Sequence, residues 1–167
     1  MNKSSNIARG GVSVALLVLL IYIASIAPSS KLTILTVSSA IIPYSIITTN
    51  TKNSFIVYVA ASILSLILIG PKAETISYLL FFGLYGFLKY YIEKVNKPLY
   101  EIILKLVYFN VTLFILYSLY TKFFTTLISG AFPLYIMLLL AQIAFFVFDY
   151  ALTIIINYMR KRFIKDI

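Results

Sequence analysis

The sequence predicts an all-α polytopic membrane protein, a six-helix transmembrane bundle, on three observations. The 167 residues are 62% hydrophobic and only 11% charged, whereas soluble domains average about 45–50% apolar and 25% charged residues. Six apolar runs follow one another along the chain, and the charges lie mainly between them. A water-soluble fold of this length could not bury so much apolar surface, so lipid is the solvent that fits.

The six runs are joined by short links, so residues 1–167 are expected to form a single domain. Pro28 closes the first run and Gly70-Pro71 closes the third, as these residue types interrupt helices. Links of a few residues force successive helices to lie antiparallel and side by side. The runs are Gly11–Ala27, Leu32–Thr49, Ser54–Ile69, Ile76–Ile92, Leu99–Tyr120 and Pro133–Met159.

Three stretches leave alternatives open. Lys122–Phe132 is too long to extend the last helix and is interpreted as an interfacial or re-entrant segment. The first run follows Lys3 and Arg9, as a signal peptide would, but Pro28 makes a poor cleavage context and a retained helix is expected. Pro43 marks either a broken helix that lines a transporter site or an ordinary kink, which is the favoured interpretation.

Small residues predict where helices approach one another closely. Gly11 and Ala15 in the first run form a small-xxx-small pair, as do Ala61 and Ser65 in the third. Such pairs let two helix backbones come together in lipid. The same close packing is expected of two glycines in the fourth run, Gly83 and Gly86.

The distribution of Lys and Arg predicts the orientation. With the N-terminus inside, eleven cationic residues lie on the inner side and three on the outer side. Because cationic residues are retained in the cytoplasm, a cell-membrane protein with both termini cytoplasmic is expected. The basic tail is interpreted as a topology anchor that meets anionic lipid head groups. The outer residues are Lys31, Lys72 and Lys122, and the inner ones are Lys3, Arg9, Lys52, Lys89, Lys94, Lys97, Lys105, Arg160, Lys161, Arg162 and Lys165.

Several function classes are disfavoured by what the sequence lacks. It contains no Cys, His or Trp, so the usual ligands for zinc, iron and copper and the Cys–His nucleophile pair are missing. It also has no phosphate loop, dinucleotide fingerprint, HExxH or GxSxG motif. These motifs carry the common phosphate-binding and hydrolytic chemistries. We therefore expect no metal, no cofactor, no nucleic-acid partner and no enzymatic activity.

Asp149 is the one carboxylate that falls deep inside a predicted span. A charge there costs about 2.5–3.5 kcal/mol on insertion scales, so it should face the bundle. Gln142, Asp149, Thr153 and Asn157 share one side of the last helix, because they are spaced by seven, four and four residues. This polar stripe is interpreted with equal weight as a substrate or ion site and as a hydrogen-bonded seam between helices.

The fifth run offers partners at a similar depth, namely Lys105 and Asn110. For Lys105, however, an i,i+4 pair with Glu101 or snorkelling to the inner surface is favoured. Three tyrosines also lie deep in the spans, where their hydroxyls need partners or contact a ligand: Tyr85, Tyr108 and Tyr150. The candidate ligand-binding residues are Asp149, Gln142, Thr153, Asn157, Asn110, Tyr108 and Lys105.

A short cationic segment runs into a small-residue helix over Ile7–Ala15. With the basic charge and the six runs, this pattern resembles the substrate-binding S components of energy-coupling-factor transporters, over the whole chain in helix count and topology. Gly11 and Ala15 stand where that family has an Ala-xxx-Ala signature. The link between the first two runs, which commonly helps to cap the vitamin in that family, is only a few residues here.

The resemblance implies a subunit that binds a vitamin or micronutrient for uptake. It also implies a transporter membrane subunit and ATPases as partners, with Gly11 and Ala15 as candidates for partner-helix packing. The alternative is a non-transporting multi-pass protein that acts through helix contacts in envelope assembly or as an accessory subunit.

Overall fold

The structure of this protein is a computed structural model that describes residues 3–95, 97–123 and 134–164. The described residues form helices and short links, without a strand. The elements in chain order are α1 (Lys3–Ile26), α2 (Lys31–Ser39), α3 (Ile41–Thr48), α4 (Thr51–Leu68), α5 (Ala73–Ser77), the π-helix η1 (Tyr78–Phe82), α6 (Gly83–Ile92), the 3₁₀ turn η2 (Glu93–Val95), α7 (Pro98–Phe123) and α8 (Leu134–Ile164).

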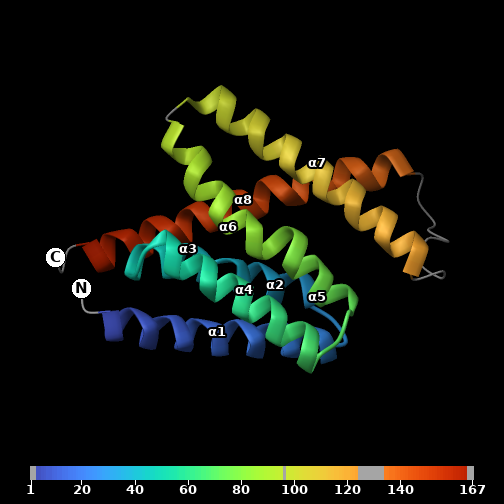
Figure 1. Ribbon diagram of the computed structural model, residues 1–167. Helices are drawn as coiled ribbons and strands as arrows, with labels where there is room; N and C mark the ends of the chain where they lie inside the picture. The colour runs from blue at the N-terminus through green and yellow to red at the C-terminus, as the bar shows by residue number, and fades with distance from the viewer. Residues whose placement is uncertain (1–2, 96, 124–133, 165–167) are drawn as a thin grey trace.

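The helical segments run back and forth between two ends of the molecule. Both termini and the links that follow α3 and α6 lie at one end, which we call the terminal end (Figure 1). The links that follow α1 and α4 lie at the opposite end, together with the end of α7 and the start of α8 (Figure 1). The predicted antiparallel order of the segments is therefore present in the ribbon.

Five helical stretches are long and apolar enough to cross a membrane. They coincide with five of the six predicted runs. The remaining run, Ile76–Ile92, lies in a helical stretch from Ala73 to Ile92 that the π-helix interrupts. An all-helical, membrane-compatible fold is thus present. The five stretches are Ser4–Ile26, Lys31–Thr48, Thr51–Leu68, Pro98–Lys122 and Tyr135–Lys161.

The second run is a kinked pair of helices rather than one continuous helix. α2 ends at Ser39, and the Ala40 N–H donates to the Val37 carbonyl at 3.1 Å in a tight turn. Pro43 has no N–H to donate to the Ser39 carbonyl, four residues earlier, which accounts for the break at this point. Its ring packs against Gly86 of α6, where a Cβ atom would lie 2.8 Å from the Pro43 Cδ.

The other predicted small-residue contacts are confirmed inside the fold. Ala61 and Ser65 are both fully buried. At Gly83 a Cβ atom would lie 2.7 Å from the Tyr58 ring. Gly11 and Ala15 are different, because both are exposed and a Cβ at Gly11 would meet nothing within 4 Å.

The chain around the predicted interfacial segment needs one correction. Lys122 and Phe123 belong to α7, which continues past the expected end at Tyr120. α7 continues through Lys122 and Phe123 because both residue types are compatible with a helix, and no Pro or Gly follows until Gly130. The rest of that segment, residues 124–132, lies outside the described residues.

Candidate functional site

A cluster of four charged side chains joins α6, α7 and α8 near the terminal end. Asp149 of α8 lies between two lysines: its Oδ2 is 2.9 Å from the Lys105 Nζ, and its Oδ1 accepts a hydrogen bond from Lys89. Glu93, at the end of α6, is 2.8 Å from the Lys89 Nζ and 3.3 Å from the Lys105 Nζ. Two positive and two negative charges therefore meet in one cluster that is formally neutral.

Lys89 is the centre of this cluster, because its side chain is completely buried. Besides its two carboxylate partners, its ammonium group donates to the Thr153 hydroxyl at 2.8 Å and to the Asp149 carbonyl at 3.2 Å. The Tyr85 hydroxyl donates to the Asp149 Oδ1 at 2.6 Å. Each charge is thus surrounded by opposite charge or hydrogen-bonding groups, the condition under which a buried charge is tolerated.

Helical spacing explains how the sequence brings these groups together. Tyr85, Lys89 and Glu93 follow one another at intervals of four residues, so they lie on one face of α6 and its last turn. Asp149 and Thr153 have the same spacing on α8. Two facing stripes therefore meet with Tyr85 and Lys89 opposite Asp149. Among the described residues no group of His, Cys, Asp and Glu could hold a metal ion.

The structure confirms one geometric prediction and corrects another. Asp149 faces protein and pairs with the fifth predicted span through Lys105, as expected. The favoured i,i+4 pair of Lys105 with Glu101 is wrong, because Lys105 is buried against Asp149 and Glu93. The Lys105 ammonium group lies close to two carboxylates, those of Asp149 and Glu93, which attract it more effectively than the single carboxylate of Glu101.

The predicted stripe on α8 divides into separate parts. Thr153 joins the charged cluster, whereas Gln142 donates to the Asn110 Oδ1 at 2.8 Å, away from Asp149. Asn157 is exposed and does not join the cluster. Tyr108 donates to the Leu80 carbonyl at 2.8 Å. Tyr150 is 69% exposed, so the expectation that its hydroxyl meets a partner inside the bundle is not met, and the alternative of a ligand contact stays a prediction.

The sequence pattern does not predict that Lys89, Tyr85 and Glu93 meet Asp149. In that pattern Lys89 is only an inner-side cation, and Tyr85 is a deep tyrosine whose hydroxyl needs a partner or contacts a ligand. The signal that identifies it is the Tyr85-xxx-Lys89-xxx-Glu93 spacing, which repeats one helical turn and places a lysine between an acid and a hydroxyl.

A separate apolar cavity of about 330 Å³ lies toward the other end of the molecule. Its walls come from the start of α2, from the end of α5, from η1, from the middle of α7 and from α8. None of the seven candidate residues lines it. The lining residues are Leu32, Thr36, Ser77, Phe81, Phe82, Phe109, Leu113, Leu116, Ala141, Ala144, Phe145 and Phe148.

Polar contacts tie the helices together beside this cavity. The Ser77 and Tyr120 hydroxyls lie 2.9 Å apart, and Tyr120 also donates to the Ala73 carbonyl at 2.7 Å. Lys31 at the first residue of α2 pairs with Glu74 of α5 at 2.6 Å. These contacts connect α2, α5 and α7 at the end where the cavity lies.

A second apolar depression lies on the outside, between α1 and α4. Gly11 and Ala15 form part of its floor, and Leu64 and Leu68 of α4 form its other wall. Both predicted partner-packing residues are therefore accessible to an approaching helix. That they bind a partner stays a prediction.

Comparison with family models, curated proteins and solved structures gives no match to this chain.

Proposed function

We propose that this protein crosses the cell membrane six times, with both termini in the cytoplasm. The five long apolar helices would be joined by the stretch from Ala73 to Ile92, whose twenty residues reach about 30 Å if helical throughout. Lys89 is the charge that this span must bring into the membrane, and the pairs with Asp149 and Glu93 offset it.

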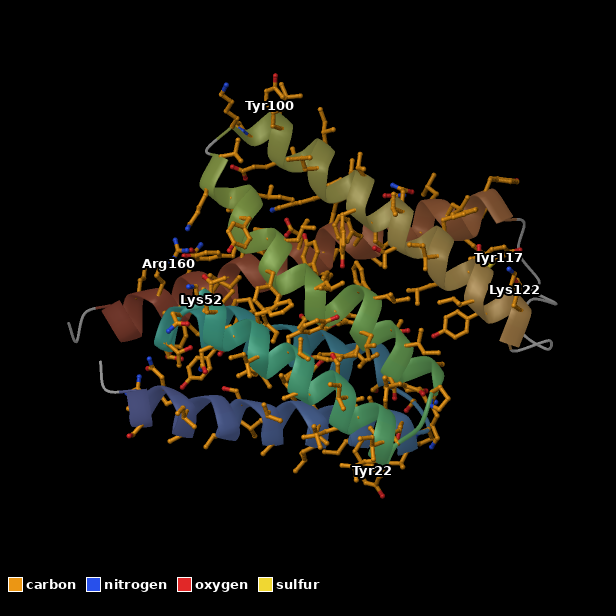
Figure 2. The ribbon with its side chains drawn as sticks, in the orientation of Figure 1. Tyr22, Lys52, Tyr100, Tyr117, Lys122 and Arg160 are labelled. Atoms are coloured by element: carbon orange, nitrogen blue, oxygen red, sulfur yellow. The ribbon has the colours of Figure 1, made fainter. Side chains whose placement is uncertain are left out.

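The charge distribution supports this orientation. Lys52 and Arg160 lie at the terminal end and Lys122 lies at the other end (Figure 2). Ten of the eleven cationic residues expected inside belong to segments and links that meet at the terminal end, and Lys165 lies outside the described residues. By the positive-inside rule that end faces the cytoplasm. The apolar cavity then lies in the outer half of the membrane.

Within this frame, we propose that the protein is the substrate-binding subunit of an uptake transporter. The observation that carries this proposal is the cavity of about 330 Å³, which falls within the range of about 300–1,000 Å³ typical of small-molecule sites. A cavity in the outer half is reached from the side on which a nutrient arrives.

The lining indicates the chemistry of the ligand. Aromatic and aliphatic side chains make up most of the wall, and the hydroxyls of Thr36 and Ser77 are its polar groups. No charged residue lines the cavity. The ligand that fits is an uncharged, vitamin-like molecule with an aromatic or apolar body and one hydrogen-bonding group.

The charged cluster is assigned a different role, that of a seam which fixes α6, α7 and α8 to one another. Both Asp149 oxygens already accept hydrogen bonds from protein groups, and Lys89 is fully enclosed. A ligand would have to break these bonds in order to bind there. The seam interpretation therefore fits the contacts better than the ligand interpretation.

The exposed Gly11 and Ala15 support the partner proposal. Small residues let a helix of a transporter membrane subunit approach α1 closely, and the ATPases would act through that subunit. The same surface also favours the second candidate function, a non-transporting membrane protein that works through helix contacts. A bound small molecule distinguishes the two candidates.

The deciding experiment is mass spectrometry of small molecules that co-purify with the protein in mild detergent. The small molecule should co-purify with the parent chain. It should be lost from the Ala141→Phe variant, because the added ring fills the cavity. Val147→Phe is the matched control, since Val147 is 64% exposed on the same helix. Equal ligand content in all three chains, or no ligand in the parent, would count against the transporter proposal.

A further inference from the structure

The π-helix η1 lies where the fourth predicted span passes the cavity, and two tyrosines from other helices hold its backbone. The Gly83 N–H donates to the Tyr78 carbonyl, five residues earlier, which defines the wide turn. The Tyr58 hydroxyl of α4 donates to the Leu79 carbonyl at 2.8 Å. The Tyr108 hydroxyl of α7 donates to the next carbonyl, that of Leu80, also at 2.8 Å.

The contact made by Tyr58 requires a glycine at position 83. A Cβ atom there would lie 2.7 Å from the Cε2 and 2.8 Å from the Cδ2 of the Tyr58 ring. The ring can reach the wide turn only because this position has no side chain. Backbone carbonyls in lipid are costly unless a donor reaches them. Within the wide turn, the Leu79 and Leu80 carbonyls each accept a hydroxyl from another helix.

The last two residues of η1, Phe81 and Phe82, both line the cavity. Both also meet the same residue of α8, because their ring centroids lie 5.5 and 5.6 Å from that of Phe148. Single-turn π-segments of this kind are frequent at functional sites.

We infer that the π-helix is a built positioning device: Tyr58 and Tyr108, with Gly83, hold Phe81 and Phe82 together as one aromatic wall of the cavity. The inference rests on the proposed function for the meaning of the cavity. The arrangement selects a flat aromatic ligand, because neighbouring rings of the wall offer faces and edges against which such a ligand packs. Tyr58 and Tyr108 act through the phenylalanines and are positioning residues.

A ligand-free measurement tests the positioning itself. The chain has no cysteine, so pairs of cysteines can be introduced without background. Phe81→Cys with Phe148→Cys, and Phe82→Cys with Phe148→Cys, should both be linked by a short bis-maleimide. Phe81→Cys with Phe146→Cys is the control pair that should link slowly, since Phe146 is 47% exposed on another face of α8.

Removing the two hydroxyls should disturb one of the two pairs. In the Tyr58→Phe, Tyr108→Phe background, the linking rate of at least one pair should fall about threefold or more, in line with the loss of hydrogen bonds in lipid. Tyr150→Phe should leave both rates unchanged, because Tyr150 lies on the exposed face of α8. Linking of only one pair in the parent, or rates unaffected by the two substitutions, would overturn the inference.

A second readout separates this inference from the proposed function. Indole serves as the aromatic probe, and alkylation of Ala141→Cys by N-ethylmaleimide in lipid nanodiscs reports on occupancy of the cavity. Indole should slow alkylation in the parent background and slow it less without the two hydroxyls. Linking that depends on the tyrosines without any effect of indole supports the positioning and contradicts the cavity as a binding site. If indole slows alkylation but the linking rates do not depend on the two tyrosines, the cavity is supported as a binding site and the positioning is contradicted.

Discussion

The helices α1–α4 and the helices α6–α8 are held together by different kinds of contact. In the first group the contacts are small and hydroxyl-bearing: Ser54 donates to the Ser45 hydroxyl at 2.9 Å, and Gly10 packs against Asn53. In the second group large rings and charges meet around Tyr85. Small residues let backbones approach directly, whereas rings hold helices further apart and leave space for a cavity.

Burial is lowest in α7 and α8. Half of the membrane-crossing window of α2 and α3 is buried inside the protein, compared with 11% of the window in α7 and 17% in α8. α7 also diverges from α1–α4 in the ribbon (Figure 1). A region with so little shared surface needs a few strong contacts. The charged cluster supplies them at the terminal end.

The largest expected effect comes from removing Asp149, the carboxylate that pairs with both lysines of that cluster. Asp149→Leu leaves Lys89, which is fully buried, with Glu93 alone and leaves one positive charge uncompensated. Breaking a buried ion pair from one side costs about 3–5 kcal/mol of unfolding free energy. We expect little monodisperse protein from this variant in size-exclusion chromatography and a much lower midpoint of thermal unfolding.

Asp149→Asn is the matched control for shape. The amide can still accept hydrogen bonds from Tyr85 and Lys89, so most of the fold should remain, with a smaller loss of stability than in the leucine variant. If the leucine variant unfolds at the same temperature as the parent, the cluster is not what holds α6, α7 and α8 together.

The sequence predicts that Asp149 faces protein, but it does not decide which charges surround it. The cost of a charge in lipid places Asp149 toward protein without any structure. The sequence offers Lys105 as a partner at a similar depth, but it favours a pair of Lys105 with the correctly spaced acid Glu101 on its own helix. The choice between them depends on how closely α6 and α8 approach α7, which only the three-dimensional packing determines. The burial of Lys89 also depends on this packing and does not follow from the sequence alone.

The fold class can be predicted from the sequence, whereas the cavity cannot. The six apolar runs predict helices because composition and length alone decide which segments suit lipid. The π-helix has no comparable signal in Tyr78–Phe82, since its carbonyls are held by hydroxyls from distant parts of the chain, Tyr58 and Tyr108. The cavity that this segment borders could not be derived without those contacts.

An intermediate effect is expected where α6 meets α3. At Gly86 a Cβ atom would lie 2.8 Å from the Pro43 Cδ and 3.0 Å from the Ile42 Cβ. Neither is the end of a flexible side chain, so Gly86→Ala should lower the free energy of unfolding by about 1–3 kcal/mol through overpacking. The measurement is the thermal midpoint in detergent.

Gly11→Leu is the companion variant, because a Cβ at Gly11 meets nothing within 4 Å. It should leave the thermal midpoint unchanged. If the proposed transporter subunit docks on α1, the same substitution should reduce its co-purification with this protein. A loss of stability as large as that of Gly86→Ala would show that the Gly11 face is internal packing.

The smallest effect is expected from the ion pair at the other end, Lys31 with Glu74. The pair is as short as those in the cluster, at 2.6 Å, but the Lys31 side chain is 44% exposed. Exposed pairs contribute about 0–1 kcal/mol, because water competes for both charges. Lys31→Gln should therefore lower the thermal midpoint only slightly.

Salt distinguishes the two ends further. The screening length falls from about 10 Å at 0.1 M to about 3 Å at 1 M, so the difference in thermal midpoint between Lys31→Gln and the parent should vanish at 1 M salt. The effect of Asp149→Leu should persist there, because ions do not reach Lys89. A Lys31→Gln effect as large as that of Asp149→Leu, or one that salt leaves unchanged, would show that both ends are equally enclosed.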